Sequence, residues 1–203
     1  MRAVRRPWTG LLQGRRARGG REQGAGGGPQ GGVVGVRALI LGGARSGKSL
    51  YAERMTGSLG GRVLYVATAL PNDDPDLQRR VSLHRLRRPA AWGTVEAGDL
   101  DRVPGEADNW DAVLLDSLTL WVSARLYAVG EEETLASFGG FLEEISPHPR
   151  PFVLVSDEVG LGVVPESAEG RVFRDVLGAA NQRAARAADE VHLCVAGIGV
   201  RIK

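Results

Sequence analysis

The chain contains the octapeptide Gly42-Gly43-Ala44-Arg45-Ser46-Gly47-Lys48-Ser49, which matches the pattern G-x-x-x-x-G-K-[ST]. An apolar run at residues 36–41 precedes it and has the composition of a buried strand. Residues 50–55 follow it and read as the first turns of a helix. This order of strand, loop and helix predicts a phosphate-binding loop, and a glycine-rich turn with a chance lysine is the alternative.

Each residue type in the octapeptide has a physical role in binding phosphate. The glycines let backbone N–H groups curl around an anion, and the N-terminus of the following helix adds partial positive charge. We predict that Lys48 is catalytic through its charge on the terminal phosphates, and that the hydroxyl of Ser49 ligates Mg²⁺. All eight residues are therefore expected to contact a nucleotide.

The composition limits the class of protein. The chain has 203 residues, 43% hydrophobic and 25% charged, as expected for a globular protein. It has no apolar run approaching the roughly 18 residues of a membrane span, and no segment of signal-peptide type, so we expect a cytoplasmic location. Because the single cysteine, Cys194, lies in an apolar run, neither a disulfide nor a thiolate metal site is expected.

The basic character of the chain belongs to residues 1–36. They hold seven arginines and eleven glycines against one carboxylate, Glu22, whereas residues 37–203 hold 19 basic and 23 acidic residues. We predict that residues 1–36 form a disordered extension to a catalytic domain at 37–203. The extension either contacts nucleic acid or an anionic surface, or is dispensable. Its only aromatic residue is Trp8, which favours a dispensable extension, so nucleic acid is not expected as a partner.

A second phosphate-site signal lies at residues 112–117, an apolar run that contains Asp116. At the carboxyl edge of a parallel sheet, Asp116 is predicted to hold Mg²⁺ directly or through water, and the alternative is that it caps the next helix. The remaining pattern alternates strands and helices. It predicts an α/β fold of the P-loop NTPase type, a mostly parallel sheet flanked by helices, with further strands at 62–68, 92–96, 152–155 and 191–196 and helices at 118–126, 134–145 and 168–188.

Two carboxylates, Asp157 and Glu158, follow the strand at 152–155 and precede a glycine-containing loop. They suit substrate positioning or general-base catalysis, and a capped turn is the equally weighted alternative. Glu96, at the end of another strand, either accepts hydrogen bonds from a base or ribose or is an exposed carboxylate.

A basic helix is predicted to end before Pro89, with His84 among several arginines: Arg79, Arg80, Arg85, Arg87 and Arg88. A histidine among guanidinium groups tends to stay neutral, and a neutral imidazole is a nucleophile. The arginines can stabilise charge on an attacked phosphate. Covalent catalysis by His84 at phosphorus and a solvated basic face that includes a histidine both remain open from the residues alone.

Taken together, the motifs make residues 37–203 resemble the bifunctional adenosylcobinamide kinase/adenosylcobinamide-phosphate guanylyltransferase family. The motifs that carry the resemblance are the phosphate-binding loop, Tyr65-Val66-Ala67-Thr68, residues 80–88 with Pro89 and Trp92, Leu114-Leu115-Asp116-Ser117-Leu118-Thr119, Glu158-Val159-Gly160-Leu161-Gly162 with Pro165-Glu166, and residues 173–203 from Phe173-Arg174-Asp175 through Asn181-Gln182.

The resemblance implies two reactions of cobalamin biosynthesis. A corrinoid, adenosylcobinamide, is phosphorylated with ATP or GTP, and GMP is then transferred from GTP to that phosphate through a guanylylated His84. The resemblance also implies a homotrimer and nucleotide contacts at Ala67, Thr68, Ala69, Arg85, Leu86, Arg87, Arg88, Glu96 and Asp116.

Two residues depart from the family pattern: Asp157 and Ala124 stand where the family usually or commonly has Asn. We expect these departures to affect the corrinoid contacts and not the nucleotide chemistry. Two competing functions are a small-molecule kinase without a covalent step, and a nucleotide-gated binding module whose arginine-rich extension docks nucleic acid.

Overall fold

The computed structural model describes residues 35–69, 78–79, 82 and 85–203. Almost all of the predicted extension lies outside this set. His84, predicted as the nucleophile, also lies outside the described residues.

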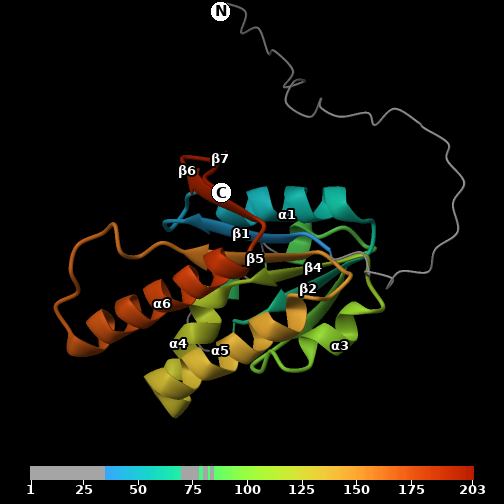
Figure 1. The fold of residues 1–203 in the computed structure, drawn as a ribbon. Coiled ribbons are helices and arrows are strands. Elements are labelled where there is room, and N and C mark those ends of the chain that lie inside the picture. The colour runs from blue at the N-terminus through green and yellow to red at the C-terminus, as the bar shows by residue number, and fades with distance from the viewer. Residues whose placement is uncertain (1–34, 70–77, 80–81, 83–84) are drawn as a thin grey trace, which may run out of the picture. The chain divides into compact units, whose positions relative to one another are not determined.

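The core of the fold is a seven-stranded sheet in the order β3-β2-β4-β5-β1-β6-β7 (Figure 1). Six strands are parallel, and only β7 runs antiparallel, to β6. The strands are β1 Arg37–Gly42, β2 Val63–Ala67, β3 Gly93–Glu96, β4 Ala112–Asp116, β5 Phe152–Asp157, β6 Glu190–Val195 and β7 Ile198–Arg201. With a phosphate-binding loop after its first strand, this sheet confirms the predicted α/β fold of the P-loop NTPase type.

Helices cover both faces of the sheet (Figure 1). One face packs against α1 (Lys48–Leu59), and the other packs against α4 (Leu118–Val129), α5 (Glu131–Ile145) and α6 (Ala168–Ala187), with the short α3 (Val103–Ala107) beside α5. None of the described helices is both long and apolar enough to cross a bilayer.

The strands are apolar on both sides because both faces of the sheet are covered. Successive side chains of a strand point to opposite faces, so Ala38 and Ile40 of β1 pack on the α1 side, whereas Leu39 packs on the α4–α6 side. The α1 side also buries Tyr65 of β2, which is 2% exposed. This burial matters for the site, because Tyr65 carries a hydroxyl that needs a partner.

Apart from the basic helix before Pro89, much of which lies outside the described residues, the predicted strands and helices agree with the observed ones to within a few residues. Helix α3 and strand β7 were not predicted. The hairpin β6–β7 turns through Ala196 and Gly197, which both have positive φ, 51° and 82°. Alanine rarely adopts this conformation, so the residue pair carries little turn signal in the sequence. The hairpin packs against α1, where a Cβ added at Gly199 would lie 2.4 Å from the ring of Tyr51.

Candidate nucleotide site

The phosphate-binding loop has the backbone conformation that anion binding needs. Gly47, at the N-terminal cap of α1, has φ 90° and provides no capping side chain. The backbone N–H of Tyr51 donates to Gly47 O at 3.0 Å. The N–H groups of the turn before Tyr51 have no partner within the helix, so they are oriented for an anion at the helix N-terminus.

The hairpin β6–β7 contacts and stabilises this loop. The backbone N–H of Gly197 donates to Ser46 O at 2.8 Å, and a Cβ added at Gly47 would lie 3.0 Å from the Cα of Gly197. A side chain at position 47 would therefore be strained by its φ and would press on the hairpin.

Lys48 forms an ion pair with the carboxylate that ends β5. Its Nζ lies 2.6 Å from Asp157 Oδ1, and its side chain is 12% exposed. Asp157 is itself held by two neighbours, because its N–H donates to Thr119 Oγ1 at 2.7 Å and its carbonyl accepts from Asn181 Nδ2 at 3.0 Å. The structure thus brings the predicted catalytic lysine and Asp157 together.

Glu158, the other predicted carboxylate, behaves as the capped-turn alternative describes. Its Oε1 accepts a hydrogen bond from the N–H of Gly160, two residues later, at 2.7 Å. The two neighbouring carboxylates therefore differ. Asp157 faces the nucleotide loop, whereas Glu158 stabilises the start of the next loop.

Asp116 faces the loop from the end of β4, as predicted. Its Oδ1 accepts from the hydroxyl of Ser49 at 3.5 Å, and its Oδ2 accepts from the hydroxyl of Tyr65 at 2.8 Å. The alternative that Asp116 caps the next helix is wrong, because the cap of α4 is Ser117, whose Oγ accepts from the N–H of Leu120. Burial, and then the Asp116 charge, raise the pKa of Tyr65, so the phenol remains a donor.

Ser49 and Asp116 together fit Mg²⁺. They supply one hydroxyl and one carboxylate oxygen 3.5 Å apart. Magnesium at phosphate sites is typically held by one or two protein oxygens, with phosphates and water completing the shell. The described residues contain no group of three or more His, Cys, Asp or Glu side chains able to hold a metal. The hydroxyl of Ser49 and the carboxylate of Asp116 fit a cation whose remaining ligands are phosphate oxygens and water.

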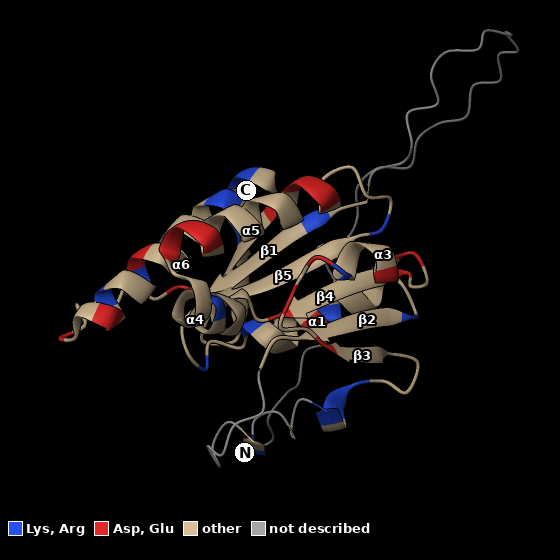
Figure 2. Cartoon of the chain, turned by 90° about the horizontal axis from the view of Figure 1, so that it is seen from below, with Lys and Arg blue, Asp and Glu red and all other residues tan. Residues whose placement is uncertain are grey.

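The end of the basic segment is attached to the α1 side of the sheet by its arginines. Figure 2 shows this short basic segment beside β3. Arg85 lies 2.5 Å from Glu96 Oε1, and Arg87 lies 3.0 Å from Glu53 Oε1 on α1. Arg88 donates to Thr94 Oγ1 at 2.9 Å. Glu96, predicted to contact a base or ribose, is thus paired with Arg85. Leu86, between Arg85 and Arg87 in the sequence, is 82% exposed.

The end of β2 contributes Ala67, Thr68 and Ala69, all predicted nucleotide contacts. Thr68 is 2% exposed, and its hydroxyl donates to Ser117 O at 2.6 Å and accepts from Ser117 N at 2.9 Å. The side chain of Thr68 therefore ties the ends of β2 and β4 together. Ala67 and Ala69 are partly exposed at the same edge.

The roles of Tyr65, Thr119 and Asn181 were not predicted from the sequence. All three contact Asp116 or Asp157 through hydrogen bonds. The only sequence signal for Tyr65 was a phenol within an otherwise apolar strand, since buried tyrosines usually hydrogen-bond.

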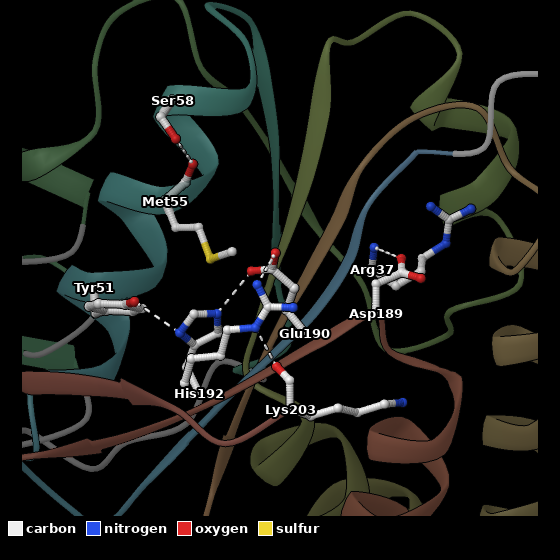
Figure 3. Close-up of polar contacts among 9 residues, drawn as sticks. Arg37, Tyr51, Met55, Ser58, Asp189, Glu190, His192 and Lys203 are labelled. Atoms are coloured by element: carbon white, nitrogen blue, oxygen red, sulfur yellow. Dashed lines mark hydrogen bonds and ion pairs between the residues drawn. The ribbon is translucent and has the colours of Figure 1, made fainter. Parts of the chain in front are cut away.

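Outside the site, His192 has a structural role. Its Nδ1 lies 3.0 Å from the hydroxyl of Tyr51 on α1, and its Nε2 lies 3.1 Å from Glu190 Oε2 (Figure 3). The histidine is 7% exposed, so it joins α1 to β6 from within the protein.

The glycine-rich loop, its lysine and the facing serine–aspartate pair define a P-loop nucleotide-binding protein. The model of the cobinamide kinase / cobinamide phosphate guanyltransferase family matches residues 38–202. The chain belongs to this family, which confirms the resemblance and makes it an enzyme of the kinase and guanyltransferase class.

Curated relatives agree with this family. The bifunctional adenosylcobalamin biosynthesis protein CobU of Salmonella typhimurium is 42% identical over 180 residues, covering 81% of this chain and 98% of the relative. The CobU protein of Escherichia coli is 39% identical over 180 residues with the same coverage. The CobP protein of Pseudomonas aeruginosa is 38% identical over 170 residues, covering 83% of this chain and 98% of that protein.

Solved structures with some similarity include a KaiC-like protein from Pyrococcus horikoshii, with a TM-score of 0.44 and 15% identity, covering 83% of this chain and 73% of that one. The RadB recombinase matches with a TM-score of 0.43 and 18% identity, covering 80% of this chain and 75% of that one.

Proposed function

We propose that the chain phosphorylates adenosylcobinamide with ATP or GTP, and then transfers GMP from GTP to the new phosphate through His84. The observation that carries the nucleotide chemistry is the meeting of Lys48, Ser49 and Asp116 at one edge of the sheet. Membership of the family supports the corrinoid substrate.

For the kinase step, the loop from Gly42 to Ser49 binds the terminal phosphates and Lys48 neutralises part of their charge. Phosphoryl transfer is catalysed mainly by positioning and electrostatic stabilisation, which these residues supply. Ser49 and Asp116 would hold Mg²⁺, which when bound neutralises developing charge on the transferred phosphoryl group. Lys48 is already held at the loop by Asp157, so the lysine is positioned before the nucleotide enters.

For the guanylyl transfer, a ring nitrogen of His84 attacks the α-phosphorus of GTP. A P–N bond forms, the bond to the β-phosphate oxygen breaks, and pyrophosphate leaves. An oxygen of the corrinoid phosphate then attacks the same phosphorus and releases the neutral histidine. The docking of Arg85, Arg87 and Arg88 on the α1 side supports this proposal, because it anchors the segment next to His84 at the nucleotide edge.

The experiment that tests this function is labelling with α-³²P GTP. We expect wild-type protein to retain acid-labile, base-stable label, as a phosphoramidate does, and His84→Ala to retain none while still phosphorylating the corrinoid. His148→Asn is the matched control, because His148 packs on Phe152 on the α4–α6 side of the sheet and its replacement should leave labelling intact. Corrinoid phosphorylation without any label on wild type would favour the kinase that lacks a covalent step.

Two further parts of the proposal concern the whole chain. We infer a homotrimer, supported by apolar side chains of the last residues that are 55–61% exposed: Val195, Ile198, Val200 and Ile202. A monomeric mass by light scattering would contradict it.

We also infer that residues 1–36 are a dispensable disordered extension, so a chain starting at residue 35 should keep both activities. Loss of function on that truncation, with no corrinoid phosphorylation by the full chain, would favour the nucleic-acid-docking module.

A further inference from the structure

Tyr65 lies where the core meets the nucleotide edge. It is paired in the sheet with Leu114 of β4, and Asp116 lies two residues further along that strand. Residues two apart on a strand share a face, and diagonal neighbours are within reach of an aromatic side chain. The ring of Tyr65 therefore stays in the core while its hydroxyl reaches the carboxylate at the strand end.

The two carboxylate oxygens of Asp116 have different partners, and the hydroxyl of Tyr65 binds one of them. Oδ2 accepts from Tyr65 at 2.8 Å, and Oδ1 is the oxygen directed at Ser49, at 3.5 Å. The short bond to a buried phenol restricts rotation of the carboxylate. It leaves the oxygen that faces the loop in the position where a cation between Ser49 and Asp116 would need it.

The face of the Tyr65 ring contacts an arginine of the basic segment. The guanidinium carbon of Arg88 lies 3.4 Å from the ring centroid of Tyr65. Arg88 also donates to Thr94 Oγ1, and Thr94 is the β3 residue paired with Tyr65. Its Nε is buried without a hydrogen-bond partner among the described residues, so the ring face is a large part of what holds this guanidinium.

We propose that Tyr65 is a positioning residue of the nucleotide site, whose hydroxyl orients Asp116 toward Ser49 and whose ring seats Arg88. The inference rests on the proposed function, because it assigns Tyr65 to the Mg²⁺-nucleotide site of that enzyme. A single buried side chain thereby joins the cation site of the kinase step to the arginine segment that neighbours the nucleophile.

The test measures nucleotide binding rather than turnover, with ribose-labelled fluorescent GTP titrated in Mg²⁺ and in EDTA. We expect Tyr65→Phe to lose roughly tenfold of the Mg²⁺-dependent tightening, the scale typical of residues that orient metal ligands. Its affinity in EDTA should stay close to that of wild type. In an Asp116→Asn background, Tyr65→Phe should have no further effect, because Tyr65 acts through Asp116.

The matched control is Tyr51→Phe, which removes a phenol from α1 whose hydroxyl contacts His192 (Figure 3). This variant should keep the full response to Mg²⁺. The proposal is overturned if Tyr65→Phe responds to Mg²⁺ like wild type, if both variants lose the response equally, or if wild-type affinity does not depend on Mg²⁺. Corrinoid phosphorylation by wild type is assayed separately, so failure of the proposed function is distinguished from failure of this inference.

A second measurement does not depend on Tyr65→Phe folding. The chain has three tyrosines, Tyr51, Tyr65 and Tyr127, and Tyr127 is 96% exposed. With 3-fluorotyrosine incorporated, the ¹⁹F resonance of Tyr65 is assigned by elimination from Tyr51→Phe and Tyr127→Phe. Adding Mg²⁺ to the GTP complex should shift the Tyr65 resonance more than the other two. A Tyr65 resonance that does not move would contradict the proposal.

Discussion

Asp116 and Asp157 are the last residues of two adjacent parallel strands, β4 and β5, and both lie at the edge that carries the nucleotide loop. The identified partners of Asp116 are hydroxyls, those of Ser49 and Tyr65, whereas Asp157 faces the ammonium group of Lys48. Two aspartates on adjacent strands thus make different contacts at the same edge of the sheet.

The different contacts of the two carboxylates favour different roles for them. Hydroxyl donors orient a carboxylate, and those of Ser49 and Tyr65 hold Asp116 at the phosphate-binding loop, where a carboxylate oxygen suits Mg²⁺. An ammonium group at 2.6 Å neutralises Asp157 and keeps Lys48 at the loop until phosphates compete for it. We therefore assign Asp116 to the metal and Asp157 to the lysine.

The largest effect is expected from Lys48→Ala, which removes the charge shared by both steps and leaves Asp157 as an uncompensated negative charge beside the phosphates. Loss of a positioned electrostatic group typically lowers turnover by about 10²–10³-fold. We expect losses of this size in both corrinoid phosphorylation and guanylylation of the protein, measured with γ- and α-labelled GTP.

The control for this variant is Lys203→Ala, which changes the chain's other lysine. Lys203 contacts the end of α6, where its Nζ donates to Ala185 O at 2.9 Å. It should leave both activities intact. A loss confined to one step in Lys48→Ala would show that the loop serves only that reaction.

Asp116→Asn should come next, with a kinase rate about 100-fold lower at a fixed Mg²⁺ concentration, because the amide keeps the shape but removes the charge that holds the cation. Raising the Mg²⁺ concentration should restore part of the rate. Asp111→Asn, at an aspartate that pairs with Arg62 outside the site, is the charge-matched control. If the rate and Mg²⁺ dependence of Asp116→Asn match those of wild type, the assignment of Asp116, rather than Asp157, to the metal is contradicted.

Asp157→Asn should have the smallest effect. Removing the carboxylate releases Lys48 for phosphate, and a partly exposed ion pair is worth up to about 1 kcal/mol. We expect nucleotide affinity to rise by up to about fivefold, by titration with fluorescent GTP. Kinase turnover should stay within a few-fold of wild type. A turnover loss as large as that of Asp116→Asn would instead assign Asp157 to general-base catalysis, which the sequence left open.

Much of this site was predictable because its signals are local. The phosphate-binding loop is contiguous, and the apolar strand before Asp116 places that residue at an edge whatever the neighbouring strands are. The hairpin strand β7 was missed because its turn uses a positive-φ alanine, Ala196, which carries no recognisable signal. The pairing of Arg85 with Glu96 was missed as well, since a strand-end carboxylate and a helical arginine have no preferred spacing.

The sequence by itself determined the class of fold, the loop that binds phosphate, and Asp116 as a metal-ligand candidate, because these depend on contiguous residues and strand periodicity. Only the tertiary structure decided the partners of the two carboxylates. Lys48 and Asp157 lie on α1 and β5, and Tyr65 and Asp116 lie on β2 and β4, so their contacts arise from the strand order. Strand order results from packing the whole core, which no single segment encodes.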